Sequence, residues 1–298
     1  MSLPATDGLL LLDKPLGMSS NTALQRVKRL AGGVKAGHTG SLDPLATGML
    51  PICLGEATKL AGELLSQRKS YEFELLLGER SETGDAEGSI VERCVVPVLT
   101  ETGVAEVLLR FHGPSRQIPP MYSALKRQGQ PLYRLARAGI MVEREPRDIA
   151  IESLQLVSLS PPALTLRALC SKGTYVRVLA EDIARALGTC GRLQRLRRLF
   201  VEPFGEEPML TLDELEQHTR DGRAWPLLTA DRAVGHLPAL NLAAGAVRAL
   251  SQGKSLPLAA PRDGQWRLYD EARTFVGLGL SDADGTLRVQ RLFCAAQQ

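Results

Sequence analysis

One twelve-residue stretch, Gly37–Gly48 (GHTGSLDPLATG), constrains the fold of this chain more than any other. Three glycines and a proline within it exclude a regular helix and a central strand, so the stretch is predicted to be a tight loop. It contains a single carboxylate, Asp43, and the following Pro44 biases Asp43 toward extended backbone geometry. Apolar residues on both sides, such as Leu42 and Leu45, predict that the loop is anchored to a core.

Two interpretations of Asp43 follow from the residue types. A carboxylate held on a shaped loop can act as a nucleophile or as an acid/base group. Alternatively, the Asp-Pro pair only begins a turn and the glycines serve the backbone. The loop residues by themselves leave both interpretations open.

Length and composition limit the classes of protein to consider. A chain of 298 residues forms one large or two smaller domains. The net charge of +3 permits a nucleic-acid partner without requiring one, and 4% aromatic residues argue against a surface built from many stacking platforms. The four leucines Leu9–Leu12 are too short for a signal-peptide core, and no apolar run has the length of a membrane span, so a cytoplasmic location is expected.

The cysteines and histidines give no pattern of metal binding. The histidines lack an H-x-x-x-H spacing and the cysteines lack a C-x-x-C pair, so neither a metal site nor a disulfide framework is expected. Most of the cysteines lie among apolar residues and are predicted to be buried free thiols. They are Cys53, Cys94, Cys170, Cys190 and Cys294.

The order of secondary-structure signals predicts a mixed α/β (α+β) fold. Residues 8–12 form an apolar strand, followed by a turn and a helix that begins at Ser19 or Ser20 and ends at Gly32-Gly33. Later strands alternate apolar and polar residues, and helices are interspersed between them. Together these features predict a largely antiparallel sheet. The later strands are expected at residues 49–54, 69–75, 147–159 and 163–171.

Two basic segments suggest contact with nucleic acid. Between Gln117 and Val142 no acidic residue occurs, and Tyr122 and Tyr133 are interleaved with Lys126, Arg127, Arg134 and Arg137. This combination suits the gripping of RNA phosphates and stacking, although a run of one charge is more often a solvated face. Residues 191–199 carry four arginines, which form either a solvated edge-strand face or part of an RNA path.

The last part of the chain has a different pattern of predicted secondary structure. From about Ala233, short strands alternate with turn signals at Asp263-Gly264 and Asp284-Gly285, which predicts a small β-rich module. We therefore expect two domains, residues 1–232 and residues 233–298.

Several phrases of the sequence resemble one enzyme family. The phrase GHTGSLDPLATGMLPICLGEATK (Gly37–Lys59) resembles the signature of the tRNA pseudouridine-55 synthases, the bacterial TruB-type enzymes. Four further phrases match in the same order: DKPLGMSS from Asp13, the polar segment 78–88, QIPPMYSALK from Gln117, and GTYVR from Gly173. The resemblance implies a pseudouridine-synthase fold, a thumb insertion at about residues 117–140 and a PUA-like RNA-binding domain at 233–298.

The resemblance also implies roles for individual residues. Asp43 corresponds to the catalytic aspartate, Arg177 to the arginine that pairs with it, and Tyr71 to the tyrosine that stacks on the target base. His38, Tyr175 and Leu196 would line the substrate site. Without the resemblance, Tyr71 is a core aromatic, and Arg177 forms an ion pair with Glu181 four residues on.

The implied reaction is isomerisation of uridine 55 in the TΨC loop of tRNA, which requires the base to be flipped out. It needs no cofactor, metal or guide RNA, and a monomer acting on the TΨC stem-loop is expected. A glycoside- or nucleoside-cleaving enzyme remains an alternative, although it would need a second carboxylate. A non-catalytic RNA-binding or tRNA-folding protein is the other alternative.

Two points are left open by the sequence. Asp43 could attack either the sugar or the base. The sequence also has Val201-Glu202-Pro203-Phe204 where the family has V-G-P-F. Glu202 therefore raises the question of whether the backbone turns there without a glycine.

Overall fold

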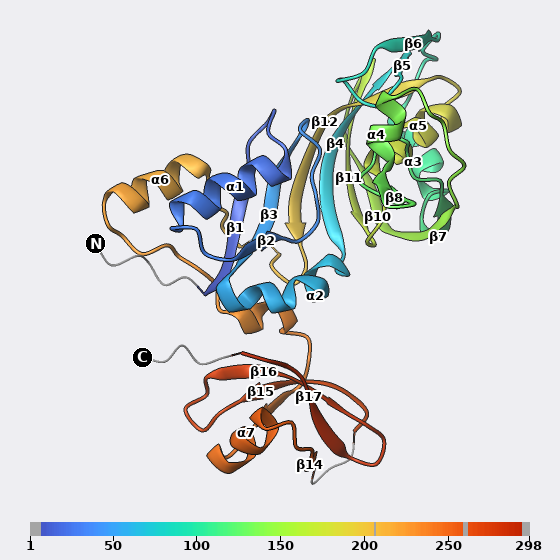
Figure 1. The fold of residues 1–298 in the computed structure, drawn as a ribbon. Helices are drawn as coiled ribbons and strands as arrows, with labels where there is room; N and C mark the ends of the chain where they lie inside the picture. The colour runs from blue at the N-terminus through green and yellow to red at the C-terminus, as the bar shows by residue number, and fades with distance from the viewer. Residues whose placement is uncertain (1–6, 206, 259–261, 294–298) are drawn as a thin grey trace.

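The computed structural model describes residues 7–205, 207–258 and 262–293. A large sheet with helices forms the main body, and a small β-rich domain follows at the C-terminal end (Figure 1). This arrangement confirms the predicted mixed α/β fold. None of the helices within the described residues is long and apolar enough to cross a membrane.

The large sheet has the strand order β1-β3-β12-β4-β11-β10-β7, with β2 paired to β3. Every pair in it is antiparallel except β3 with β12, so the prediction of a largely antiparallel sheet is confirmed. Because β12 lies between β3 and β4, the alternative that its arginines belong to an edge strand is wrong. The strands are β1 (Gly8–Lys14), β2 (Ala36–His38), β3 (Ala46–Leu54), β4 (Lys69–Leu77), β7 (Gly113–Gln117), β10 (Arg147–Ser160), β11 (Ala163–Cys170) and β12 (Gly191–Val201).

Two groups of helices cover one face of this sheet and leave a cleft between them. Helices α1 (Ser20–Leu30) and α6 (Leu212–Arg220) pack on Leu10 and Leu50 at the β1–β3 end. Helices α3 (Glu101–Leu109) and α5 (Val176–Ala186) pack on Phe73 and its neighbours on β4, β11 and β10 (Figure 1). On β3, Ala46 packs with the α3–α5 group and Leu50 packs with the α1–α6 group. Side chains alternate between faces along a strand, and these two residues are an even number of positions apart, so both groups lie on the same face.

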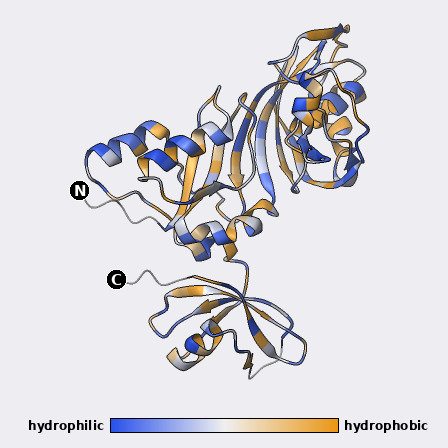
Figure 2. Ribbon diagram, viewed as in Figure 1, coloured by the Kyte–Doolittle hydropathy of each residue, from blue (hydrophilic) through white to orange (hydrophobic). Residues whose placement is uncertain are grey.

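The opposite face of β1 and β3 is also covered. Leu9, Leu11 and Met49 pack there against η1 (Gly55–Leu60), α2 (Ala61–Leu65) and η2 (Ala230–Val234). With both faces covered, β1 is apolar along most of its length, whereas β4 includes more polar residues (Figure 2).

The C-terminal domain is a five-stranded sheet with the order β13-β15-β16-β17-β14. It contacts the main body through Lys59, whose Nζ donates to the Leu292 carbonyl at 2.6 Å, and through Tyr269, whose hydroxyl donates to Asp231 at 2.7 Å. Leu278 is buried in the same core cluster as η1 and η2. Its elements are β13 (Ala239–Asn241), α7 (Ala244–Ser251), β14 (Leu256–Pro257), β15 (Gly264–Tyr269), β16 (Phe275–Ser281) and β17 (Thr286–Leu292).

The prediction for the cysteines is only partly right. Cys53 and Cys170 are buried free thiols, as predicted, but Cys94 and Cys190 form a disulfide. Their spacing in sequence gives no indication of this pairing. Gly78 brings them together, because its N–H donates to the Cys190 carbonyl and its carbonyl accepts from the Cys94 N–H. Cys294 lies outside the described residues.

We expect replacement of Gly48 with alanine to destabilise the main body. Gly48 has φ +97°, and a Cβ added there would lie 2.2 Å from the Arg198 carbonyl oxygen on the neighbouring strand. A fixed backbone clash combined with a disfavoured φ should lower the free energy of unfolding by at least about 2 kcal/mol. Chemical denaturation measures this value. Gly62→Ala is the control, because its Cβ meets no atom within 4 Å and alanine favours the helix; equal stability of the two variants would contradict the prediction.

Candidate active site

The loop that carries Asp43 is fixed on both sides of that residue. Ser20, at the start of α1, accepts a hydrogen bond from the Leu42 N–H at 2.7 Å and donates one to the Leu42 carbonyl at 3.0 Å. After Asp43, the Pro44 carbonyl accepts from the Gly17 N–H at 2.8 Å. The turn before α1 therefore holds the Asp43 loop in place through the residues on either side of Asp43.

A buried arginine holds the earlier part of the loop. Arg198 on β12 is 1% exposed. Its Nη2 donates to the Gly40 carbonyl at 3.1 Å and its Nε to the Met49 carbonyl at 2.6 Å. Arg198 thus ties the loop to the strand that follows it.

Asp43 lies against Arg177, which comes from the first turn of α5. Arg177 Nη2 is 3.1 Å from Asp43 Oδ2, and the Arg177 side chain is buried. Loss of solvent around Asp43 raises the pKa of its carboxyl above the ordinary value, and the Arg177 cation opposes that rise. The sequence offered Glu181 as an ordinary partner for Arg177, but the ion pairs of Arg177 are made with Asp43 and Asp85.

Asp85 is a site residue that the sequence analysis did not identify. It is 2% exposed and lies 3.5 Å from Arg177 Nη1. Its Oδ1 accepts from the Thr83 hydroxyl at 2.5 Å and from the Glu87 N–H at 3.0 Å. Asp85 lies in the polar segment 78–88, and the resemblance of this segment to a family phrase was the one sequence signal that pointed to a site.

Asp85, the second carboxylate beside Arg177, affects the ionisation of Asp43. Asp85 is fixed against β12 by an isolated β-bridge to Leu193. Its negative charge raises the pKa of Asp43, in the same direction as burial. One Arg177 cation is therefore shared by two carboxylates: it lowers the pKa of Asp43, whereas the charge of Asp85 raises it.

A cavity of about 400 Å³ opens beside Asp43. Five of the six residues assigned to the site by the resemblance line it, namely Asp43, Tyr71, Tyr175, Arg177 and Leu196. Tyr71 on β4 is buried, and burial raises the pKa of its hydroxyl. A carboxylate, a stacking ring and an apolar side chain are thus collected around a space next to the Asp43–Arg177 pair.

His38 lies in a different cavity. This second cavity, of about 600 Å³, shares Asp43 and Arg177 with the first, and both are lined by Ser123 and Ala124 of the thumb. Burial and the nearby Arg198 cation lower the pKa of His38, so the neutral imidazole is favoured. Among the described residues, buried His38 Nδ1 has no hydrogen-bond partner.

Residues 117–140, the thumb that the resemblance implies, are hydrogen-bonded to residues around the site at two points. Gln117 exchanges two hydrogen bonds with the backbone of Tyr175, at 2.8 Å and 3.2 Å. Further along, the Tyr122 carbonyl accepts from Arg177 at 2.6 Å, and the Tyr122 hydroxyl donates to Glu82 at 2.7 Å. The arginine that pairs with Asp43 is therefore also a contact point for the thumb.

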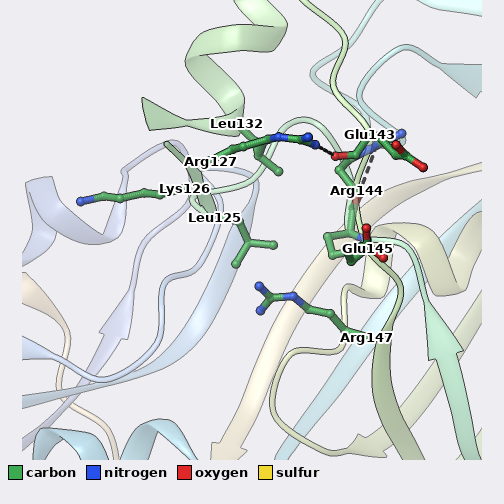
Figure 3. Close-up of a pocket in the computed structure, with 9 residues that line it drawn as sticks. Leu125, Lys126, Arg127, Leu132, Glu143, Arg144, Glu145 and Arg147 are labelled. Carbon is green, nitrogen blue, oxygen red and sulfur yellow. Dashed lines mark hydrogen bonds between the residues drawn. The ribbon is translucent and has the colours of Figure 1, made fainter. Parts of the chain in front are cut away.

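A third cavity, of about 280 Å³, is lined by Lys126 and Arg127 of the thumb and by charged residues that follow it (Figure 3). The latter are Glu143, Arg144, Glu145 and Arg147. Arg127 donates to the Glu143 carbonyl and Arg144 to the Pro119 carbonyl, so backbone oxygens hold these two guanidinium groups without neutralising them. Leu125 and Leu132 supply its apolar lining. Four basic and two acidic side chains line this cavity, so its net charge is positive and suits RNA phosphates.

The four arginines of β12 do not form one positive surface. Arg197 pairs with Asp13 at 2.8 Å, Arg192 with Glu79 at 3.4 Å, and Arg198 is buried. Much of the positive charge of this segment is therefore paired or buried and is not available on a surface that could bind RNA.

The substitution of Glu202 for the family glycine leaves the turn intact. Glu202 is not among the residues with positive φ, so the backbone there does not need a glycine. Its carboxylate pairs with Arg68 at 2.6 Å. Within the described part of the chain, no group of three or more His, Cys, Asp or Glu side chains could hold a metal ion.

Comparison with solved structures identifies the fold. The chain resembles a chain of the Cbf5-Nop10-Gar1 complex with a TM-score of 0.74 and 24% identity, covering 97% of this chain and 85% of that one. It resembles a chain of an H/ACA RNP bound to a substrate RNA containing 2′-deoxyuridine with a TM-score of 0.72 and 22% identity, covering 97% and 86% of the two chains. Both solved chains therefore share the fold of this protein.

Sequence comparison then identifies the family. Residues 28–176 match the N-terminal domain of TruB family pseudouridylate synthases, residues 177–228 a tRNA pseudouridylate synthase B C-terminal domain, and residues 238–293 a pseudouridine synthase II TruB C-terminal domain. The chain is 48% identical over 286 residues to tRNA pseudouridine synthase B of Aromatoleum aromaticum, covering 96% of this chain and 92% of that protein. It is 47% identical over 299 residues to that of Burkholderia mallei, covering 98% of each. The chain belongs to the TruB family of pseudouridylate synthases.

Proposed function

We propose that this protein converts the uridine at position 55, in the TΨC loop of tRNA, to pseudouridine. The observation that carries the proposal is the Asp43 carboxylate held 3.1 Å from buried Arg177, at a cavity floored by Tyr71. The reaction breaks the N1–C1′ bond, turns the uracil and joins C1′ to C5. A proton leaves C5 and one is gained at N1, so no electron is transferred to another molecule and no cofactor is required.

The site residues that the resemblance implies have the following roles in this reaction. The target base is flipped out of the RNA stack into the cavity, where Tyr71 stacks on it. Asp43 is the nucleophile, at C1′ of the sugar or at C6 of the base, and Arg177 keeps it ionised. Tyr175 and Leu196 line the space for the base. His38, in the adjoining cavity, contacts the RNA rather than acting as a base.

The partner is tRNA alone. The thumb is part of this chain and closes over the site through Tyr122, so the protein carries its own means of holding the RNA. We propose that it acts in the cytoplasm as a monomer and without a guide RNA. Residues 233–298, a PUA-like domain in this proposal, extend the surface available to the tRNA.

A nucleoside-cleaving enzyme is the weaker candidate. It would need a second carboxylate that is free to protonate the leaving group. Asp85 and Glu87 both lie near Asp43, and Thr83, the Glu87 N–H and Arg177 already occupy the oxygens of Asp85. Asp85 is therefore held as a charged partner of Arg177 rather than as a general acid.

Tritium release from tRNA labelled with [5-³H]uridine tests the proposal. The wild-type enzyme is expected to release the tritium of one uridine per tRNA, because C5 loses its hydrogen when it bonds to C1′. A transcript with cytidine at position 55 is the control and is expected to release none. Free uracil as the product would instead indicate a nucleoside-cleaving enzyme, and binding without release would indicate an RNA-binding protein.

We expect Ser20→Ala to lower turnover about tenfold, because a displaced nucleophile loses its alignment with the substrate. The substitution removes both hydrogen bonds to Leu42 and leaves two buried backbone groups unpaired, which costs about 1–3 kcal/mol of stability. Ser19→Ala is the matched control. It loses the N-cap of the same helix, at about 1 kcal/mol, without touching Leu42. Equal turnover of the two variants at a temperature where both are folded would contradict the prediction.

A further inference from the structure

Two buried cations on the floor of the Asp43 cavity have no role in the reaction as described so far. Lys69 is 7% exposed and Arg198 is 1% exposed, and both line the cavity. Lys69 lies two residues before Tyr71 on β4, and Arg198 lies directly opposite Tyr71 on β12. Since side chains alternate along a strand, all three point to the same face of the sheet.

Both head groups are fixed by neutral partners. Lys69 Nζ donates to the Leu65 carbonyl at 3.2 Å and to the Gln67 carbonyl at 2.5 Å, at the end of α2. Arg198 donates to the Met49 and Gly40 carbonyls. Throughout the described chain, the ion pairs include neither residue. Carbonyl partners hold a cation in position without cancelling its charge.

The two cations converge on one point. A Cβ built on Gly40 would lie 3.6 Å from Arg198 Nη1 and 3.7 Å from Lys69 Cε. The absence of a side chain at Gly40 therefore leaves space between the two head groups. Burial, followed by repulsion from Arg198, lowers the pKa of Lys69 to about 8. Two positive charges that are close together and shielded from water repel each other. Such a concentration of positive charge is typical of a site that binds a negatively charged group.

We propose that Lys69 and Arg198 form an oxyanion-stabilising pair for the negative charge that the uracil ring acquires during the reaction. This inference rests on the proposed function. A base stacked on Tyr71 lies next to both cations, because they flank Tyr71 on the same face. Donors that are already in position when charge develops need no reorganisation, and in a water-poor site they stabilise a transition state strongly.

The charge arises by either route open to Asp43. If Asp43 attacks C1′, the electron pair of the C1′–N1 bond remains on the uracil and spreads over N1, O2 and O4. If Asp43 adds to C6, the electron pair of the C5=C6 bond passes toward O4. In both routes the ring is neutral again once C5 has bonded to C1′, C5 has lost its proton and N1 has gained one. Asp43 leaves C1′ as C5 attacks it in the first route, and leaves C6 as the C5=C6 bond re-forms in the second. In each case it departs as a carboxylate with the electron pair of its bond. The pair is therefore needed only while the base is anionic.

A phosphate of the RNA backbone could bind the same two cations. Experiments can distinguish this phosphate from the uracil anion. A phosphate contact contributes to tRNA affinity and to its salt dependence. Stabilisation of the uracil anion contributes to the rate of the bound complex and leaves affinity unchanged. Single-turnover rates at saturating enzyme and filter binding across salt concentrations measure these two quantities.

The main variant is Lys69→Met, which removes the charge and keeps the length of the side chain. We expect its single-turnover rate to fall about 100-fold, as for the loss of one oxyanion donor, with tRNA affinity within threefold and an unchanged salt slope. Lys35→Met is the matched control, since Lys35 is exposed and lines neither cavity that contains Asp43. An unchanged rate for Lys69→Met overturns the proposal, and so does a salt slope reduced by about one with the saturating rate intact.

A second measurement does not depend on Lys69→Met folding. Because the pKa of Lys69 is about 8, the wild-type rate should fall as the pH rises above that value, whereas Lys69→Arg keeps its charge and should lose this decline. The charged or titratable groups that face Lys69 are Arg198, Cys170, Lys172 and Glu202, and both enzymes share them. Identical alkaline profiles would overturn the proposal. Failure of the wild-type enzyme to release tritium would instead reject the proposed function itself.

Discussion

Replacing Asp43 with asparagine is expected to abolish pseudouridine formation, lowering turnover by about 10⁴-fold or more. An amide has nearly the shape of a carboxylate but is a poor nucleophile. The loop would keep its geometry, because Ser20, Gly17 and Arg198 hold its backbone and do not contact the Asp43 side chain. The affinity for tRNA should therefore stay within about threefold of the wild-type value.

Tritium release and filter binding, performed on the same preparation, test this prediction. Burial raises the pKa of Asp43, which means that the folded protein disfavours the ionised carboxylate. The Asp43→Asn variant should consequently be no less stable than the wild type at pH 7, and loss of activity cannot then be ascribed to unfolding. Asp148→Asn is the control, because Asp148 is exposed on β10 and should have no effect. Substantial turnover by Asp43→Asn would remove Asp43 from the mechanism.

Replacing Arg177 with methionine is expected to have the second largest effect, a loss of turnover of about 10²–10³-fold at pH 7. Arg177 lies within 3.5 Å of both Asp43 and Asp85, so its removal leaves the two carboxylates facing each other without a cation, and Asp85 is buried. Breaking such a pair by removing one partner costs about 3–5 kcal/mol of stability. The variant also loses the hydrogen bond to the thumb carbonyl of Tyr122.

The pH dependence distinguishes an electrostatic role from a purely structural one. Asp43 must be ionised to act, so the rate falls as the pH drops through its pKa. The Arg177 cation lowers that pKa, and its removal should move the acid side of the profile to higher pH. Raising the pH should restore part of the activity of Arg177→Met, and Arg177→Lys should lie between it and the wild type. A reduced rate with an unshifted acid side would contradict this account of Arg177.

Local sequence patterns predicted most of the elements around the site. The alternation of Tyr71, Phe73 and Leu75 predicted β4, and the serine caps with the apolar stripe of residues 20–30 predicted α1. These predictions succeed because hydrophobic periodicity and capping depend on residues that are neighbours in sequence. The resemblance, carried by short phrases, directed attention to Asp43 and Arg177, and the structure places them 3.1 Å apart.

Other features depend on contacts between distant segments. The Cys94–Cys190 disulfide exists because Gly78 pairs with the backbone of both residues, and no spacing of cysteines reveals that. Likewise, the arginines of β12 were expected either on an exposed edge or on an RNA path. Because β12 lies inside the sheet, Arg198 instead donates a hydrogen bond to the Asp43 loop and Arg197 forms an ion pair with Asp13.

Local sequence features were enough to predict an aspartate on a rigid loop, alternating strands with helices, and a TruB-type enzyme. Which charges meet depends on the three-dimensional arrangement of the chain. This arrangement placed Asp85 behind Arg177 and brought Lys69 and Arg198 to one side of Tyr71. The physical reason is that periodicity and propensity act over a few residues, whereas electrostatic interactions depend on distance in space, which strand order and register set.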